Sequence, residues 1–393
     1  MSPAFTTRDG VLTSGYYGVL FFGLGAHLPY WPVWLEDWGL DEAAIAWLLG
    51  LAILVRVIGG TVLPALADRY GVRRLMLGVM GVFAAIAFAL HALAGGIEAL
   101  IVLTILSALF SAPLIPLGEA MGLRAALRGG FAYAHARAIG SVAFLAMVLG
   151  MGQLLQVFGT DAVLVAVVLC FICVAALGMI HPGGGTGPRG EDRAQSREMR
   201  LLALHPIFLL FAATIAFGHS AHAVYYAYSV LHWQAAGLTE GLIGALWAFG
   251  VAAEILLMLG PGPAWVARLG PAQALGLAAA AGILRWSLMM TEPLGPLLWF
   301  CQGLHSLSYG LSLLGMMAFL AQAVPDRVAG TAQGLAAGLL SGLTMAAATM
   351  LAGWLAPATT PGGLYGLALG SALLAAVAAL ALARVWDGGR LLD

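Results

Sequence analysis

The chain of 393 residues contains no lysine and few charged residues of any kind: 9% are charged, 62% are hydrophobic and the mean hydropathy is +0.96. This composition excludes a water-soluble surface and indicates an integral membrane protein. The formal net charge of −1 lacks the basic excess that nucleic-acid binding requires, so no nucleic-acid partner is expected. The three cysteines, Cys170, Cys173 and Cys301, all lie in apolar segments, which predicts packing in place of structural disulfides.

Long polar segments are also scarce. Apolar runs of about 20 residues, the length that crosses a hydrocarbon core of about 30 Å, recur along the chain between short turns. Together they leave no room for a separate soluble domain. The twelve predicted spans are 12–34, 43–66, 75–96, 98–120, 137–158, 161–181, 206–231, 240–260, 271–290, 294–321, 328–354 and 363–385.

One long polar segment, 182–200, is rich in glycine and charge, which predicts a flexible cytoplasmic linker. We therefore expect an N-terminal six-helix bundle at 1–181, a linker at 182–203 and a C-terminal six-helix bundle at 204–393. A weak repeat with an offset of 198 residues relates the halves and aligns Arg56 with Glu254. The predicted fold class is an all-α membrane protein with twelve transmembrane helices in two pseudo-symmetric bundles, an architecture that many secondary transporters use.

The arginines outside the predicted spans fall in alternate loops and in the two tails, whereas the loops between them carry acids. By the positive-inside rule, both termini are expected in the cytoplasm. The predicted location is the cell membrane, of the bacterial inner membrane type, with many passes through the lipid bilayer.

We single out five of the charged side chains within the predicted spans as embedded in the membrane. A charge near the bilayer centre costs from about 3 to more than about 10 kcal/mol, so it persists where it faces a polar cavity or a partner. A purely structural ion-pair network is the alternative. The candidate substrate-binding or proton-coupling residues are these five, with two polar residues of the tenth span: Arg56, Glu119, Arg137, Glu254, Arg285, Gln302 and His305.

The embedded charges are three arginines and two glutamates, which leaves one positive charge over. An anionic substrate would balance it, because the planar guanidinium fork matches a carboxylate in a bidentate pair.

Aromatic and polar rings near the embedded charges are candidates for the lining of a substrate cavity. An interfacial belt of tryptophan and tyrosine is the alternative interpretation. Thr214, Gly218, His222 and Tyr226 recur every four residues and predict one polar stripe on the seventh span. His219 and His222 on this span are two potential metal ligands, but no third lies near them in the sequence, so neither a metal nor a cofactor is expected. The predicted lining residues are Tyr30, Trp31, Phe144, His222, Tyr225, Tyr226, Tyr228 and Trp247.

The second predicted span ends in the motif Asp-Arg-Tyr-Gly-Val-Arg-Arg at 68–74. An acid and arginines at a helix end can bridge neighbouring helices in one state and release them in another, while glycine permits the tight turn. We therefore predict a conformational gate formed by Asp68, Arg69, Gly71 and Arg73. An ordinary basic loop is the alternative. The motif resembles the loop signature of the major facilitator superfamily, and with twelve spans the chain is identified as a member.

Two groups within that superfamily are similar to the chain. The first is the phenylpropionate permease-like group, with similar segments at 29–35, 133–141, 250–254, 285–286 and 302–305. The second is the lactose permease type of oligosaccharide/proton symporter, which carries a Glu/Arg pair on the fourth and fifth helices and Glu, Arg and His on the eighth to tenth. In this chain Glu119, Arg137, Glu254, Arg285 and His305 occupy those helices.

The chain departs from the sugar symporters at two places. Their proton-carrying carboxylate, one turn after the histidine, has no equivalent in 306–309, so another group must carry a proton. The aromatic residue that stacks on the sugar is Phe144 here, which supplies no hydrogen-bond donor to a hydroxyl-rich ligand.

The predicted function is proton-coupled uptake of a small organic anion, such as an aromatic monocarboxylate, by alternating access. Glu254 or Glu119 would exchange the proton, and His305 would tune the balance. A proton-coupled sugar or nucleoside symporter is the alternative; an exporter or a non-transporting ligand-binding membrane protein has less support. No nucleotide loop, nucleophile motif or metal spacing indicates an enzyme. One chain of this architecture forms a complete path, so a monomer is expected.

Overall fold

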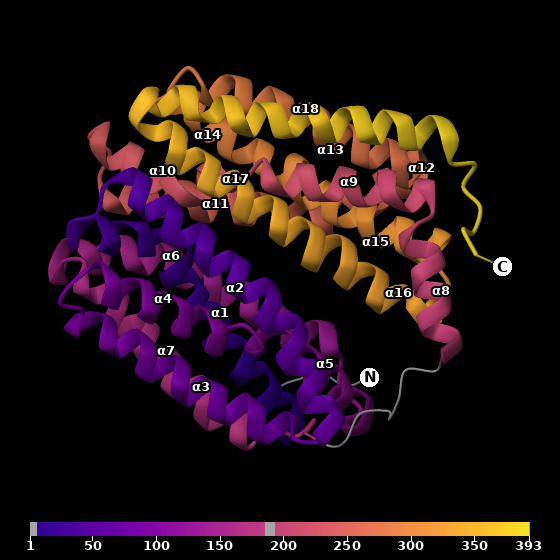
Figure 1. Ribbon diagram of the computed structural model, residues 1–393, viewed down its shortest axis with the longest axis horizontal. Helices are drawn as coiled ribbons and strands as arrows, with labels where there is room; N and C mark the ends of the chain where they lie inside the picture. The colour runs from indigo at the N-terminus through magenta and orange to yellow at the C-terminus, as the bar shows by residue number, and fades with distance from the viewer. Residues whose placement is uncertain (1–5, 185–192, 393) are drawn as a thin grey trace. The chain divides into compact units, whose positions relative to one another are not determined.

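The computed structural model describes residues 6–184 and 193–392, in which the regular elements are helices (Figure 1). Within this part, 12 helical stretches are long and apolar enough to cross a membrane, which confirms the predicted number of spans and the all-α fold class. The first half of the chain forms α1 (Arg8–Asp37), α2 (Glu42–Tyr70), α3 (Arg73–Leu90), η2 (His91–Leu93), α4 (Ile97–Ser111), α5 (Leu114–Gly129), α6 (Tyr133–Phe158) and α7 (Asp161–Met179).

The second half of the chain contains more helices because several of its spans are interrupted. It forms α8 (Arg193–Ala203), α9 (Pro206–Ser220), α10 (Ala223–Ala235), α11 (Glu240–Leu259), α12 (Gly262–Leu269), α13 (Pro271–Met289), α14 (Gly295–His305), η3 (Ser306–Leu311), α15 (Ser312–Ala323), α16 (Asp326–Gln333), η4 (Gly334–Leu340), α17 (Ser341–Leu355), η5 (Ala356–Ala358) and α18 (Pro361–Val385).

Interruptions within spans are a feature that hydropathy alone does not predict. The fourth span breaks between α4 and α5 at Pro113, whose ring removes a backbone donor. The seventh breaks between α9 and α10, at Ala221 and His222. The tenth passes through η3, a π-helical turn that begins directly after His305. Such turns are frequent at functional sites because they re-aim side chains.

The segment expected to be an unstructured linker is partly folded. Residues 185–192 lie outside the described part, but α8 follows them and ends just before the seventh span. Its Leu202 is fully buried in the core of the second half, and the guanidinium of Arg327 lies 2.5 Å from the Glu198 carboxylate. The apolar face of α8 therefore packs against the bundle. The glycine-rich composition of the preceding residues gave no indication of this helix.

The chain divides into two compact units. One takes in Met1–Asp41, Leu51–Gly190 and Trp233–Ala245, and the other Glu42–Gly50, Glu191–His232 and Leu246–Asp393. In the first unit α1 packs against α6 and α7, and α3 lies beside α7 (Figure 1). Gly25 permits the close approach of α1 to α6, because a Cβ there would lie 2.7 Å from the Phe144 carbonyl oxygen.

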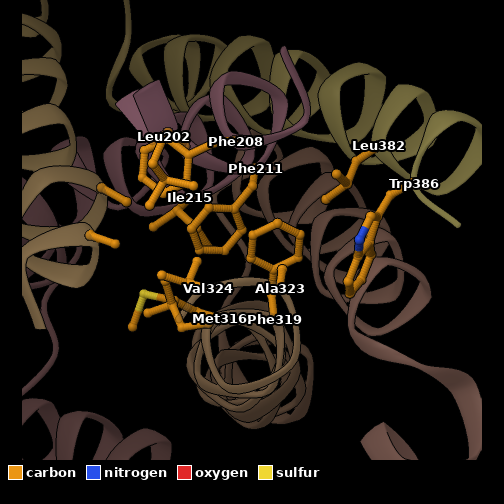
Figure 2. Close-up of a cluster of buried hydrophobic side chains, with 14 of the residues drawn as sticks. Leu202, Phe208, Phe211, Ile215, Met316, Phe319, Ala323, Val324, Leu382 and Trp386 are labelled. Carbon is orange, nitrogen blue, oxygen red and sulfur yellow. The ribbon is translucent and has the colours of Figure 1, made fainter. Parts of the chain in front are cut away.

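The second unit contains a large aromatic core. In it α18 lies beside α13 and α9, as Figure 1 shows. In this core the rings of Phe211 on α9 and Phe319 on α15 stack with centroids 4.0 Å apart, and the Trp386 ring centroid lies 4.6 Å from that of Phe319 (Figure 2). Dispersion contacts of this density stabilise a membrane bundle, in which burial away from lipid supplies little hydrophobic driving force.

Many large apolar side chains of the spans are exposed, as contact with lipid requires. Leu259 is 83% exposed, Val157 72% and Leu256 70%. In water such side chains would be costly, whereas lipid tails solvate them well.

The residues that directly follow α7, outside the sixth span, are fastened to the beginning of α3. The Arg74 guanidinium donates a hydrogen bond to the His181 carbonyl oxygen (3.0 Å), and the imidazole Nδ1 accepts one from the Gly183 amide (3.2 Å). The imidazole also packs edge-on against Tyr16. Burial, together with the nearby Arg74 charge, lowers the pKa of His181 to about 4.

We expect Phe211→Ala to lower the free energy of unfolding by about 3 kcal/mol, because it removes the ring that stacks on Phe319 and leaves a cavity. Phe300→Ala is the matched control, since that ring is 52% exposed. Thermal unfolding in detergent micelles measures both. Equal losses in the two variants would contradict the assignment of this core.

We also expect a pH-dependent stability that depends on His181. Its pKa is lower in the folded chain than the usual 6.5, so below about pH 6.5 the unfolded chain binds a proton that the folded chain excludes. Stability should therefore fall as the pH decreases from about 6.5 towards 4, by at most about 1.4 kcal/mol per pH unit. His181→Gln should show a shallower decline in melting temperature between pH 7 and 4.5. Parallel curves for the two proteins would refute this.

Candidate functional site

The deepest charge in the second unit is Arg285 on α13, whose side chain is completely buried. Its NH1 donates a hydrogen bond to Nδ1 of His305 (3.0 Å), and its NH2 donates one to Oε1 of Gln302 (3.5 Å). The guanidinium also lies over the rings of Tyr225 and Trp286, at 4.8 and 4.4 Å from their centroids. Acceptors and π faces together replace part of the water that the cation has lost, while its buried Nε has no hydrogen-bond partner within the described residues.

His305 connects this arginine to a carboxylate. A guanidinium can only donate, so Nδ1 of His305 must be the acceptor and the remaining ring proton is on Nε2. This Nε2 lies 3.4 Å from Oε2 of Glu254 on α11. The Glu254 side chain is 15% exposed. Arg285, His305 and Glu254 thus form a continuous chain of polar contacts, which we name the charge relay. The structure brings these three predicted residues together.

Aromatic residues enclose the charge relay. Tyr225 donates a hydrogen bond to Oε1 of Gln302 (3.0 Å) and stacks on Trp247, with ring centroids 4.5 Å apart. Trp247 in turn donates from Nε1 to the Ser229 hydroxyl (3.2 Å). The predicted lining residues Tyr225 and Trp247 therefore pack against the relay and hold Gln302 in place.

Tyr226 and His222 extend the aromatic shell. Their rings lie 5.8 Å apart, and the His222 ring meets that of His305 at 5.4 Å. The predicted polar stripe is interrupted between α9 and α10, yet Thr214 and His222 still line one enclosed cavity of about 10 Å³. Within the described residues, Nε2 of His222 and Nε1 of Trp286, which also lines it, are buried without a hydrogen-bond partner. The cavity is large enough for about one water molecule.

In the first unit, Arg56 lies on α2 beside α1. Its NH2 is 3.5 Å from Nε2 of His27, whose ring stacks on Trp31 at 5.3 Å. The sequence analysis singled out Arg56 and Trp31 but not His27. The position of His27 and Arg56 on consecutive spans was the available signal.

The other embedded arginine of the first unit, Arg137, has a carboxylate partner. Nε of Arg137 on α6 lies 3.7 Å from Oε1 of Glu119 on α5, so the predicted pair is brought together. The guanidinium stacks over the Phe21 ring at 4.0 Å. Tyr17, adjacent to it, donates to the Gly118 carbonyl oxygen (3.2 Å).

Some predicted lining residues have other partners. The Tyr30 hydroxyl donates to the Val148 carbonyl oxygen (2.8 Å), and the Tyr228 hydroxyl donates to that of Glu42 (2.8 Å). Trp31 is buried in a ring cluster with Trp34 and His27. Phe144 is half-buried on α6. The hydrogen bonds of Tyr30 and Tyr228 join neighbouring helices. A contact of any of these rings with a ligand remains a prediction.

The predicted gate adopts the local geometry that its sequence suggests. Gly71 has a φ of +69°, the left-handed region that glycine favours, and it reverses the chain between α2 and α3. The Arg73 guanidinium forms an ion pair with the Asp68 carboxylate across this turn, while Arg69 lies over the Tyr70 ring. Opening and closing of the turn stays a prediction.

Two further residues of the site were missed by the sequence analysis. Tyr309 stacks on His305 with centroids 5.3 Å apart and an interplanar angle of 6°, and Tyr365 stacks on Trp286. The spacing of four residues between His305 and Tyr309 could have identified the first. In the described part of the chain, no three His, Cys, Asp or Glu side chains are grouped as metal ligands.

Comparison with known proteins agrees with this architecture. The family model described as "MFS_1 like family" matches residues 11–363. The chain is 30% identical over 315 residues to the "Probable 3-phenylpropionic acid transporter" of Escherichia coli (strain K12), covering 79% of this chain and 81% of that protein. It is 28% identical over 323 residues to the "Maltose permease" of Geobacillus stearothermophilus, covering 81% and 80%.

Solved structures share the fold at low identity. The nucleoside transporter NupG superposes with a TM-score of 0.78 at 14% identity, covering 97% of this chain and 99% of that chain. A D-xylose-proton symporter superposes with a TM-score of 0.70 at 14% identity, covering 98% and 99%. The chain belongs to the MFS_1-like family and is a multi-pass membrane protein, a secondary transporter of the major facilitator superfamily type.

Proposed function

We propose that the chain is a proton-coupled symporter that imports a small organic anion, such as an aromatic monocarboxylate, by alternating access. The observation that carries this proposal is the charge relay, in which His305 lies between the Arg285 guanidinium and the Glu254 carboxylate. The similarity to a protein named for 3-phenylpropionic acid supports the substrate class.

The net charge of the embedded residues gives a reason why a proton and an anion would move together. Protonation of Glu254 would add one positive charge to the embedded set, and a bound monocarboxylate would remove one. Protonation without the anion would raise the embedded excess from one positive charge to two, and the bound anion offsets that added charge and its cost in the membrane. His305 would transmit the change, because the state of Glu254 alters the acceptor that faces its Nε2 proton.

The remaining features fit a bacterial inner-membrane transporter. Following the distribution of arginines, we propose that both termini are cytoplasmic and that residues 1–181 and 204–393 form the two bundles that rock during transport. The turn at 68–74 would then lie on the cytoplasmic side, where the ion pair of Asp68 and Arg73 can form and break as the gate. A single chain would form the complete path.

A neutral substrate is the second candidate. The identity to the maltose permease, 28%, is nearly equal to that for the phenylpropionate relative. In that case the embedded arginines would have a structural role, and the chain would be a proton-coupled sugar or nucleoside symporter.

The decisive experiment is uptake by proteoliposomes under an imposed pH gradient, acidic outside, with 3-phenylpropionate, benzoate, maltose and a nucleoside as probes. We expect accumulation of a carboxylate. Glu254→Gln should abolish gradient-driven accumulation but preserve exchange of preloaded substrate, because glutamine keeps an oxygen near His305 but cannot take up and release a proton by titration.

Glu240→Gln is the matched control, since Glu240 lies at the beginning of the same helix, within reach of Gln234. It should accumulate substrate as the unmodified protein does. Full gradient-driven accumulation in a Glu254→Gln, Glu119→Gln double variant would rule out coupling through the embedded carboxylates. Accumulation of only maltose or nucleoside would favour the neutral substrate.

A further inference from the structure

The pairing of the embedded charges identifies which arginine is left over. Glu119 faces Arg137, and Glu254 is joined to Arg285 through His305. Both carboxylates of the embedded set are therefore engaged. Among the residues that the structure describes, no carboxylate lies within ion-pair distance of Arg56. The excess positive charge is consequently located on α2, in the first unit.

Arg56 is placed where an unpaired charge is most expensive. It is the middle residue of the 29 that form α2, so the helix extends about 20 Å on either side of it. A cation at this depth needs a counter-charge or a polar path, and its only hydrogen-bond partner in the described part of the chain is the neutral ring nitrogen of His27.

His27 is held rigidly and sets the direction of the guanidinium. Its ring stacks on Trp31 with an interplanar angle of 18° and meets Phe88 edge-on at 5.4 Å. Since arginine can only donate, Nε2 of His27 is the acceptor. The contact uses one of the five N–H groups of the guanidinium, and the remaining donors keep the planar fork that binds a carboxylate.

Arg285 offers much less to a ligand. Its side chain is completely buried, its two terminal nitrogens are directed to His305 and Gln302, and two rings cover its faces. Arg56 is only partly buried. An incoming anion would have to dismantle the charge relay to pair with Arg285, whereas pairing with Arg56 breaks no ion pair.

We propose that Arg56 is the anion receptor of this transporter, binding the substrate carboxylate in a bidentate pair, with His27 as the residue that positions its guanidinium. This assignment rests on the proposed function. It gives the two units different roles: the first unit binds the anion, and the charge relay of the second unit exchanges the proton.

The test uses binding to the purified full-length chain in lipid nanodiscs, measured by calorimetry. The probes are three carboxylates, acetate, benzoate and 3-phenylpropionate, each beside its uncharged amide. The readout is the ratio of affinities for carboxylate and amide, because a merely destabilised protein loses both affinities together and keeps their ratio. We expect the ratio to fall at least tenfold in Arg56→Gln and to fall less in Arg56→Lys, which retains the charge without the fork.

The matched control is Arg128→Gln, since Arg128 is exposed at the end of α5 and should leave the ratio unchanged. His27→Leu, which removes the acceptor, should lower the ratio, and His27→Gln, which supplies one, should restore part of it.

An unchanged ratio in Arg56→Gln would overturn the assignment, and a loss confined to Arg285→Gln would transfer the receptor to the second unit; in both cases organic-anion symport would stand. If the unmodified chain favours none of the carboxylates over its amide, the proposed function fails and the assignment fails with it.

Discussion

The dehydration of arginine inside a membrane is the constraint on which the rest of the site depends. A guanidinium that leaves water needs acceptors for its donors, and the low dielectric makes each missing acceptor expensive. In this chain, histidine meets part of that need twice: His305 accepts from Arg285 and His27 from Arg56. A neutral acceptor solvates the cation without cancelling its charge, so the charge remains available for function.

Aromatic residues make this arrangement rigid. His305 is held between ring neighbours that include Tyr309, and His27 is held by Trp31 and Phe88. Together these rings cover each histidine with apolar surface that excludes water, and this strengthens the hydrogen bond between the histidine and its arginine. The same rings fasten helices to one another, which explains why so many predicted lining residues also have structural partners.

The fold, the set of embedded charges and the loop motif could all be predicted from the sequence, because a span requires about 20 apolar residues and a charge within one is easily recognised. The partners could not. His27 and Arg56 lie on consecutive spans, but the sequence does not show that their side chains face one another. The breaks near Pro113 and His222 and the π-helical turn after His305 were also hidden, since hydropathy averages over about one span and does not detect local backbone geometry. Helix α8 was missed for a related reason, because composition conceals a short amphipathic face.

The sequence by itself determined that this is a twelve-span membrane protein with three embedded arginines and two embedded glutamates, since composition and hydrophobic length are properties of each segment alone. The tertiary structure decided which charges neutralise one another. Pairing depends on the direction in which each side chain leaves its helix and on which helices touch, and both follow from packing between segments that are distant in the chain. Only that packing makes Glu119 the partner of Arg137, joins Glu254 to Arg285 through His305, and leaves Arg56 with a neutral histidine.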